Sequence, residues 1–303
     1  MKRDFTRLLD ITRDELLSLL ERARSLKELR TRNTSYKPLK DKTIALLFEK
    51  ASTRTRVSFE VGVLELGGHT IYLSSKDTQL SRGEPLRDTA RVLSRYVHGI
   101  VVRTFRQQDV EELARFSSVP VINGLSDSFH PCQILSDLFT IKEFGKDLSK
   151  AKIAFVGDGN NVANSWVEAA ILLDLHLSVA TPPAYMPEAS LLERARKNRG
   201  FHFTTDPKEA VRDADVINTD VWVSMGEKET AEKKKAFEGY SVNEELLAHA
   251  KKDAIVMHCL PAKRGEEIED AVLERFADVI FTQSENRLHV QKALLEWLLG
   301  GRE

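Results

Sequence analysis

Short apolar runs rich in β-branched residues alternate along this chain with longer stretches whose apolar residues recur at helical spacing. The apolar runs show no regular alternation with polar residues, which is typical of strands buried on both faces of a parallel sheet. Strands are predicted at residues 43–48, 70–73, 100–103 and 119–122 in the first half, and at 152–156, 177–180, 201–204, 216–218, 254–257 and 279–281 in the second.

The stretches between these strands predict helices at residues 53–66, 85–96, 111–116 and 164–173, and a last helix at 285–299 that stops at Gly300 and Gly301. This alternation predicts an α/β fold of two doubly wound parallel-sheet domains. We expect the domains at residues 1–145 and 146–284. The helix from about Pro131 and the last helix would link them.

The charge balance limits the kind of partner. The 303 residues include 45 Lys and Arg and 46 Asp and Glu, for a net charge of -1. This balance argues against nucleic acid or an anionic membrane as the main partner, so any anion site must be local. The lysine run at residues 233–235 lies among glutamates and is predicted to be a solvated helix face.

The chain begins without an apolar stretch of signal-peptide length, and no later segment reaches the apolar length of a membrane span. Its two cysteines, Cys132 and Cys259, cannot form a disulfide framework. A cytoplasmic enzyme is the simplest interpretation.

The segment S-T-R-T-R at residues 52–56 follows the first predicted strand and opens the next helix. Ser52 is well placed as the N-cap, and free backbone N–H groups with the helix dipole suit this end to an anion. The hydroxyls and guanidiniums add charge-assisted contacts to phosphate oxygens. A capped helix with surface arginines is the alternative, but the whole cluster favours an anion site.

Two further residues are predicted to face the same edge of the sheet. Arg103 ends the strand I-V-V-R, where ligands bind in open parallel sheets. His130 precedes Pro131, which is favoured at the first position of a helix, so His130 lies on the cap side. Taken alone, either residue could equally well have a purely structural role. Because both are predicted to lie at the same sheet edge as the anion-binding segment, a ligand-binding role is favoured.

S-T-R-T-R at 52–56 and H-P-C-Q at 130–133 resemble two motifs of the carbamoyltransferases, and the resemblance covers essentially the entire chain. It implies that residues 1–145 bind carbamoyl phosphate and that segment 285–303 packs back on this domain. Arg103, His130 and Thr55 would polarise the carbonyl oxygen, where negative charge develops during attack. The carbamoyl phosphate contacts implied are Ser52, Thr53, Arg54, Thr55, Gln79, Arg103, His130, Gln133, Cys259, Leu260 and Arg287.

Within this set, Gln133 would accept from the carbamoyl NH2 group. Outside the set, Arg56 would have a supporting, structural part, and Cys132 is interpreted as core packing. Gln79 lies in a polar segment that would otherwise be an ordinary surface loop. In the family the matching loop reaches into a neighbouring subunit's site. The resemblance therefore implies a homo-oligomer, either a trimer or a multiple of trimers.

A glycine-containing turn follows the predicted strand 152–156 and offers a second interpretation, a dinucleotide site. Gly157 and Gly159 fit that fingerprint, but the third small residue, Ala163, comes one position late. No acidic residue closes the next strand, so a nicotinamide-dependent oxidoreductase lacks its ribose contact. In the carbamoyltransferases this turn binds the amine substrate, which implies a contact from Asn161.

D-V-W-V-S-M-G at residues 220–226 resembles the ornithine loop of the family, and not the arginine-bearing segment expected where aspartate is the acceptor. It implies ornithine contacts from Asp220, Ser224 and Met225. An Asp-capped turn with a core methionine is the structural alternative. Cys259, in the segment H-C-L-P, would lie beside the reacting amine without acting as a covalent nucleophile, and Leu260 would offer its carbonyl.

The activity implied is transfer of the carbamoyl group of carbamoyl phosphate to the δ-amine of L-ornithine, giving citrulline and phosphate in arginine metabolism. The catalytic residues would be Arg103, His130, Asp220 and Cys259, with no metal and no other cofactor. The proton acceptor stays open between phosphate and Asp220 with Cys259. Alternatives are a carbamoyltransferase for putrescine or an acylated ornithine, and a non-catalytic anion-binding relative.

Overall fold

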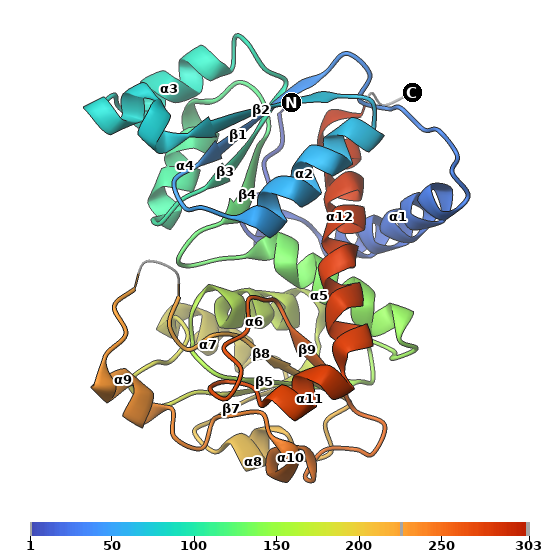
Figure 1. Ribbon diagram of the computed structural model, residues 1–303, viewed down its shortest axis with the longest axis vertical. Coiled ribbons are helices and arrows are strands. Elements are labelled where there is room, and N and C mark those ends of the chain that lie inside the picture. Colours follow the sequence, from blue (N-terminus) through green and yellow to red (C-terminus); the bar gives the residue numbers. More distant parts are fainter. Residues whose placement is uncertain (1, 225–226, 301–303) are drawn as a thin grey trace. The chain divides into compact units, whose positions relative to one another are not determined.

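The computed structural model describes residues 2–224 and 227–300, and the chain folds into two compact units. Unit 1 comprises Met1–Leu135 and Arg287–Glu303, and unit 2 comprises Ser136–Asn286. Two helices, α5 (Pro131–Glu143) and α12 (Ala277–Leu299), each begin in one unit and end in the other. Both units are α/β (Figure 1).

Unit 1 contains a parallel sheet of four strands in the order β2-β1-β3-β4. The strands are β1 (Thr43–Phe48), β2 (His69–Ser74), β3 (Gly99–Arg103) and β4 (Val121–Leu125). Phe48 pairs with Arg103, so β1 and β3 end side by side. The chain leaves β1 toward one edge of the sheet and returns to β3 on the other side, which places the reversal of strand order between these two ends.

Helices cover both faces of the unit 1 sheet. On one face, α3 (Leu86–Leu93) and α4 (Gln107–Phe116) pack Ala90, Val110 and Leu113 onto Leu47 and Val102. The other layer contains α2 (Thr53–Glu65), which packs on the last helix, and the N-terminal helix α1 (Arg13–Thr31) (Figure 1). The 3-10 turns are η1 (Leu8–Asp10), η2 (Ser75–Asp77) and η3 (Gln79–Arg82).

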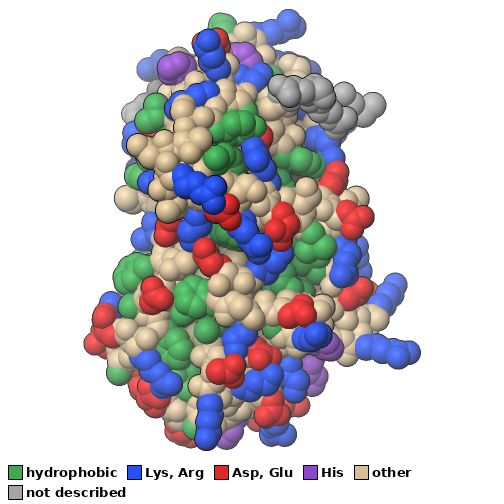
Figure 2. Space-filling model, turned by 90° about the vertical axis from the view of Figure 1, so that its right-hand side faces the viewer, with side chains coloured by type: hydrophobic (Ala, Val, Ile, Leu, Met, Phe, Trp, Pro, Cys, Tyr) green, Lys and Arg blue, Asp and Glu red, His purple; other side chains and the backbone are tan. Residues whose placement is uncertain are grey.

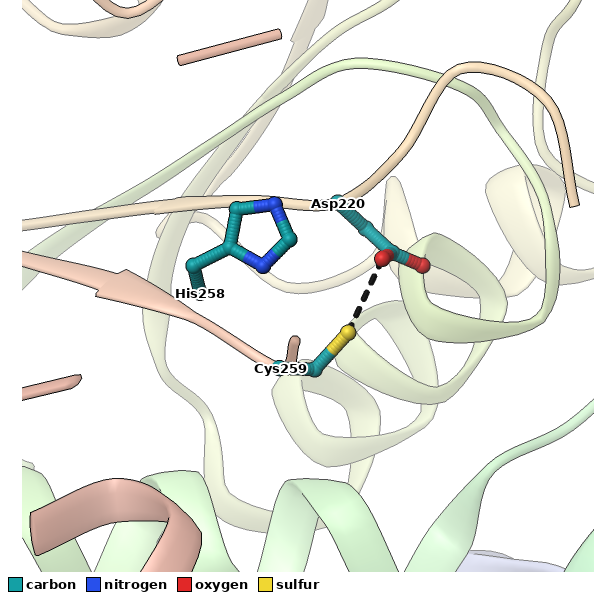
Figure 3. Close-up of side chains that lie close together, drawn as sticks. All are labelled: Asp220, His258 and Cys259. Atoms are coloured by element: carbon teal, nitrogen blue, oxygen red, sulfur yellow. Dashed lines mark hydrogen bonds between the residues drawn. The ribbon is translucent and has the colours of Figure 1, made fainter. Parts of the chain in front are cut away.

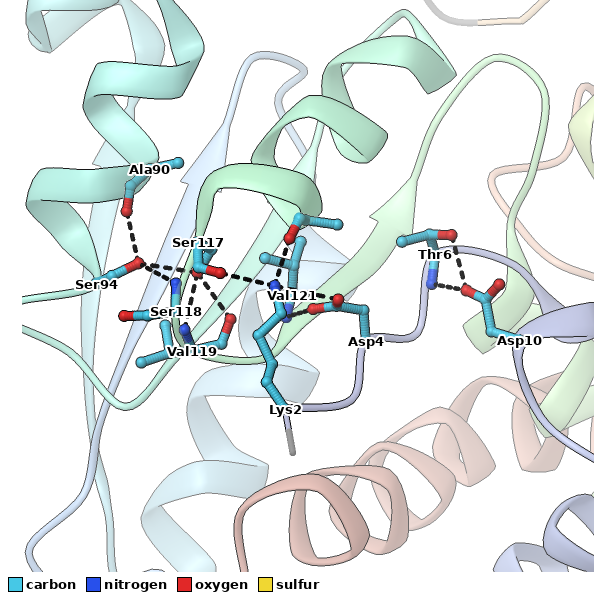
Figure 4. A network of polar contacts seen from close by, with 11 residues as sticks. Lys2, Asp4, Thr6, Asp10, Ala90, Ser94, Ser117, Ser118, Val119 and Val121 are labelled. Atoms are coloured by element: carbon cyan, nitrogen blue, oxygen red, sulfur yellow. Dashed lines mark hydrogen bonds and ion pairs between the residues drawn. The ribbon is translucent and has the colours of Figure 1, made fainter.

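The N-terminal segment closes the free edge of β4 (Figure 4). Phe5 is fully buried and its N–H donates to the Val121 carbonyl at 2.9 Å. The Asp4 carboxylate accepts the Val121 N–H at 2.8 Å, and the Asp10 carboxylate accepts the Thr6 N–H at 2.6 Å. Pairing the outermost strand in this way satisfies backbone groups that an open edge would leave exposed.

Unit 2 contains a parallel sheet of five strands in the order β7-β6-β5-β8-β9. The strands are β5 (Lys152–Val156), β6 (His176–Ala180), β7 (Phe201–Thr204), β8 (Val216–Thr219) and β9 (Ile255–His258). Thr219 pairs with both Val156 and His258, so β5, β8 and β9 end side by side. The order reverses between β5 and β8.

The helices of unit 2 also form two layers. Helices α6 (Asn161–Leu173) and α7 (Ala189–Ala195) lie together. The core cluster formed by Val156, Ile217 and Val256 is covered by residues of α8 (Pro207–Ala210), α10 (Glu244–Leu247) and α11 (Asp270–Arg275). Phe237, at the C-cap of α9 (Ala231–Ala236), belongs to this cluster and stacks on Trp222 at 5.3 Å.

Most predicted elements are confirmed to within a few residues, and one predicted strand is wrong. Residues 279–281 lie in α12, so the strand predicted there is wrong. A run of three apolar residues is equally compatible with a short strand and with one turn of a partly buried helix. In α12 one side of that turn is buried and the other is not: Ile280 is fully buried, whereas Phe281 is 56% exposed. The strand predicted at 119–122 begins two residues later, at Val121, and extends to Leu125.

Side chains of both signs of charge are interspersed on the face shown in Figure 2, in keeping with the net charge of -1. The interpretation of residues 233–235 as a solvated face is wrong for Lys233, which is only 8% exposed, whereas Lys234 and Lys235 are exposed. In the described part of the chain, no helix combines the length and apolarity needed to cross a membrane.

Candidate active site

The candidate residues gather at the strand ends where each sheet reverses its order, the position at which open α/β sheets bind ligands. In unit 1 these are the ends of β1 and β3, where the Glu49 N–H donates to the Arg103 carbonyl at 2.8 Å. In unit 2 they are the ends of β5, β8 and β9.

In unit 1, Ser52 is the N-cap of α2, and its hydroxyl accepts the Thr55 N–H at 3.2 Å. The first turn of α2 therefore opens directly at the end of β1, with its N–H groups at the sheet edge. Thr55 is fully buried, while Thr53 is exposed and Arg54 and Ser52 are half-buried. Such a helix start attracts anions through its free N–H groups and its dipole.

Two buried guanidiniums converge on the Thr55 hydroxyl. Arg103 donates from Nη1 at 3.3 Å and Arg287 donates from Nη2 at 2.6 Å. Arg103 is 8% exposed and Arg287 is 3% exposed. Arg287 is distant in sequence, and the return of α12 to unit 1 brings it to the strand ends.

The pKa of His130 reflects the positive charge of this cluster. Burial, together with the positive charges of Arg287 and Arg103, holds the pKa of His130 well below its usual range. The imidazole is therefore neutral at physiological pH, and the potential around it is positive. Burial raises the pKa of the nearby Cys132 thiol to about 12, and its Sγ donates to the Asn123 carbonyl at 3.4 Å, which makes it an inert packing residue.

Arg56 and Lys50 flank this cluster and differ in orientation. Arg56 turns outward to Glu60 at 2.9 Å and lies 3.7 Å from the centre of the Tyr72 ring. Lys50, which belongs to none of the sequence motifs, is 5% exposed and pairs with Asp127. A buried lysine two residues before the N-cap adds positive charge to this loop. Its position just after β1 is the signal that could have identified it.

Gln133 and Gln79 are placed very differently. Gln133 is fully buried at the start of α5, whereas Gln79 is exposed in η3. The segment around Gln79 shares a cavity of about 170 Å³ with Arg103, lined among others by Ser75, Leu80 and Glu84. The structure thus places this loop beside the Arg103 end of β3 without bringing the Gln79 side chain into the cluster.

In unit 2, Asp220 follows β8 and Cys259 follows β9, and the two side chains meet (Figure 3). The Cys259 thiol donates to Asp220 Oδ1 at 2.9 Å, and the Val221 N–H donates to the same oxygen at 2.8 Å. Asp220 is 6% exposed, and burial raises its pKa above the usual range. A buried carboxylate of this kind favours a cationic partner.

The H-C-L-P segment is held by a fully buried pair, His258 and Glu267, at 3.0 Å. His258 Nδ1 accepts the Leu260 N–H at 2.8 Å, so the ring proton lies on Nε2 and points to Glu267. Leu260 has a φ of 56°, a left-handed conformation rare for a branched residue. The pair therefore fixes the backbone on the C-terminal side of Cys259.

Asp220, His258 and Cys259 also have ligand atoms within 4.8 Å of one another, a spacing compatible with a metal ion. Both ring nitrogens of His258 already take part in hydrogen bonds, with Glu267 and with the Leu260 N–H. In this arrangement only the carboxylate and the thiol remain as ligands, which is fewer than a protein zinc site uses. These residues do not fit a metal centre without rearrangement.

The turn after β5 supplies the remaining residues. Asn160 caps α6 by accepting the Val162 N–H at 3.1 Å, and its Nδ2 donates to Ser224 Oγ at 3.4 Å. Asn161 is 6% exposed at the first position of α6. Asn160 thus joins Ser224 to the start of α6, where Asn161 lies. The predicted contact from Met225 lies outside the described residues.

Gly159 explains why this turn is a poor dinucleotide site. A Cβ at Gly159 would lie 2.3 Å from the Met186 carbonyl carbon and 2.4 Å from the Tyr185 oxygen. The Gly159 N–H donates to that same oxygen at 2.9 Å. In the dinucleotide fingerprint, the second glycine leaves room for the pyrophosphate. Here the protein's own backbone occupies that room.

We expect Gly159→Ala to lower the free energy of unfolding by about 3 kcal/mol or more, since rigid backbone blocks the added methyl group. Urea unfolding monitored by fluorescence measures the change. Gly99→Ala is the matched control, because the Cβ there would meet the ends of two side chains, Leu299 at 3.3 Å and Ile44 at 3.6 Å, and no backbone among its nearest atoms. Equal stability of the two variants would contradict this account of the turn.

The fold is α/β in both units, with a group of residues suited to an anion in unit 1 and a buried carboxylate suited to a cation in unit 2. A family model described as the carbamoyl-P binding domain of aspartate/ornithine carbamoyltransferases matches residues 3–143, and one described as the Asp/Orn binding domain matches residues 149–298. The chain belongs to the aspartate/ornithine carbamoyltransferase family.

Individual relatives match over almost the full length. The chain is 52% identical over 303 residues to the ornithine carbamoyltransferase of Methanoculleus marisnigri, covering 99% of this chain and 98% of the relative. It is similarly 52% identical to that of Syntrophus aciditrophicus, over 99% and 100%. Among solved structures, the ornithine carbamoyltransferase of Pyrococcus furiosus superposes with a TM-score of 0.93 at 47% identity, over 99% and 98%.

Proposed function

We propose that this chain transfers the carbamoyl group of carbamoyl phosphate to the δ-amine of L-ornithine, forming citrulline and phosphate. The observation that carries the proposal is the convergence of Arg103 and Arg287 on Thr55 at the N-terminus of α2. This cluster suits a small phosphorylated donor. Near-identical length and about 50% identity to curated ornithine carbamoyltransferases support ornithine as the acceptor.

The first part of the reaction needs positive charge near the donor. The α2 N–H groups and the guanidiniums would bind the phosphate, while Arg103, His130 and Thr55 would donate to the carbonyl oxygen. Attack on the carbonyl carbon moves negative charge onto that oxygen, so fixed donors lower the barrier. The neutral state of His130 allows it to donate a hydrogen bond without adding a third charge beside two guanidiniums.

The second part needs a neutral amine, since alkyl ammonium groups titrate near pH 10.4 in water. The δ-nitrogen attacks the carbonyl carbon, phosphate leaves with the electrons of the C–O bond, and the nitrogen passes one proton either to the phosphate or to Asp220 with Cys259. Asp220 and Cys259 would bind this amine from the ends of β8 and β9. Asn161 and Ser224, with Met225, would bind the α-amino acid end.

We further propose that the protein acts in arginine metabolism and assembles as a trimer or a multiple of trimers, with Gln79 completing the carbamoyl phosphate site of a neighbouring subunit. The exposure of Gln79 and the position of its loop beside Arg103 support this part of the proposal. A solved relative from Campylobacter jejuni, at 46% identity and a TM-score of 0.92, is described as an anabolic ornithine carbamoyltransferase.

The deciding experiment is citrulline formation by the purified protein given carbamoyl phosphate, with ornithine, putrescine, acetylornithine and aspartate as parallel acceptors. Turnover of ornithine alone supports the proposal. Turnover of another acceptor keeps the carbamoyl phosphate site and overturns the assignment of the loop at 220–226. Folded protein that turns over none of them favours an anion-binding relative without activity.

A further inference from the structure

Lys233 forms a buried ionic bridge that the reaction scheme above does not use. Its Nζ lies 2.8 Å from Asp158 Oδ2 and 2.8 Å from Glu227 Oε2. The side chain extends from α9 and is 10% exposed, whereas its neighbours Lys234 and Lys235 are exposed. Lys233 and Asp158 are both withdrawn from solvent, whereas the Glu227 side chain is 47% exposed, so loss of Lys233 leaves the buried Asp158 carboxylate uncompensated.

The two carboxylates belong to the two segments that carry the proposed ornithine contacts. Asp158 lies in the turn after β5, two and three residues before Asn160 and Asn161. Glu227 Oε2 also accepts the Ser224 N–H, at 3.1 Å. One ammonium group therefore joins the Asn160–Asn161 turn to the backbone of Ser224.

Direct contact between these segments is weaker than the bridge. Asn160 Nδ2 reaches Ser224 Oγ at 3.4 Å, near the limit of a hydrogen bond. The bridge itself has further support, because the Lys233 ammonium lies 5.0 Å from the centre of the Tyr185 ring and Tyr185 packs on Phe237 at 5.2 Å. Tyr185 also supplies the backbone that fills the space at Gly159.

The charges are consistent with a maintained ion pair. Burial works against the charge of Lys233, but its hydrogen bonds to Asp158 and Glu227 outweigh this effect and raise the pKa of Lys233. Burial raises the pKa of Asp158 to about 6 in spite of the nearby ammonium. At neutral pH the bridge is therefore ionised on both sides.

We propose that Lys233 is a positioning residue for the acceptor substrate, which holds Ser224 and Glu227 in place relative to the Asp158–Asn161 turn. The proposal rests on the proposed function, since it concerns how ornithine is bound. Lys233 does not touch the reacting atoms in this scheme. It acts through Ser224 and Asn161, so its removal should weaken ornithine binding and leave carbamoyl phosphate binding in unit 1 unchanged.

The test is Lys233→Met, with Lys235→Met as the matched control on the exposed side of the same helix. We expect the KM for ornithine to rise about 10-fold to 100-fold in Lys233→Met, as for loss of one partner of a buried ion pair. The KM for carbamoyl phosphate should change less than about twofold, and Lys233→Arg should restore most of the ornithine affinity because it keeps the charge.

A lower Tm with unchanged KM values for both substrates would show that the bridge only stabilises the fold and would overturn the proposal. If Lys233→Met does not fold, Glu227→Gln decides, because Glu227 is 47% exposed and its replacement removes only one charge of the bridge. Unchanged ornithine KM in that variant would also overturn the proposal. Wild-type protein that fails to carbamoylate ornithine would instead refute the proposed function, so the two failures are distinct.

Discussion

Replacement of Arg103 by Met is expected to lower kcat for citrulline formation about 10²-fold to 10³-fold, the usual effect of removing one preorganised donor to a developing oxyanion. Arg103 ends β3, is 8% exposed and donates to the Thr55 hydroxyl, so its guanidinium is fixed before the substrate binds. The apolar methionine side chain fills much of the same volume. Steady-state kinetics with both substrates varied measure the effect.

The same variant should change an observable that does not depend on turnover. The positive charge of Arg103 contributes to the low pKa of His130, so its removal should raise that pKa. Titration of the imidazole signals by NMR measures the shift. Arg106→Met is the control, because the Arg106 side chain is 70% exposed and pairs with Asp109 three residues away. Full activity in Arg103→Met, or an unmoved His130, would refute the role given to Arg103.

The positions of most strands were accessible from the sequence because strands of a parallel sheet are continuous apolar runs, whereas the order of the strands in each sheet was not predicted. The exception at residues 279–281 shows the limit of that signal. Three apolar residues fit either a strand or one turn of a buried helix, and only tertiary packing decided for α12. The shifted β4 has a similar cause, since Asn123 and Gly124 are unusual inside a strand yet Asn123 is fully buried there.

Some residues of the candidate site could likewise be located from the sequence, and others could not. Motif residues such as Ser52, Arg103 and Asp220 lie at strand ends, so the sequence places them near an expected ligand edge. The meeting of Arg287 with Thr55 depends on how α12 returns to unit 1, which no local pattern contains. Lys233 was misassigned for a related reason. A lysine run predicts exposure on average, and a single member can be buried when carboxylates from distant segments face it.

Replacement of Asp220 by Asn is expected to lower kcat/KM for ornithine about 10²-fold to 10³-fold and to leave the KM for carbamoyl phosphate nearly unchanged. Loss of one partner of a buried charge pair weakens binding by about 2–5 kcal/mol. Asparagine keeps the shape and can still accept from the Cys259 thiol and the Val221 N–H. The change therefore isolates the negative charge. Cys259→Ser, which keeps a donor to Asp220, is the comparison and should be less impaired.

The unliganded Asp220→Asn protein should be at least as stable as the wild type at neutral pH. Burial raises the pKa of Asp220 in the folded state above its unfolded value, so the folded protein binds this proton more tightly. Stability from this group is then greatest below the unfolded pKa and falls as the pH rises through the folded pKa. Asparagine does not titrate, so the variant should not lose this part of the free energy of unfolding as the pH rises. Urea unfolding of both proteins at several pH values would measure the difference. An unstable variant would mean that the carboxylate supports the fold, and the loss of activity could then not be assigned to ornithine binding.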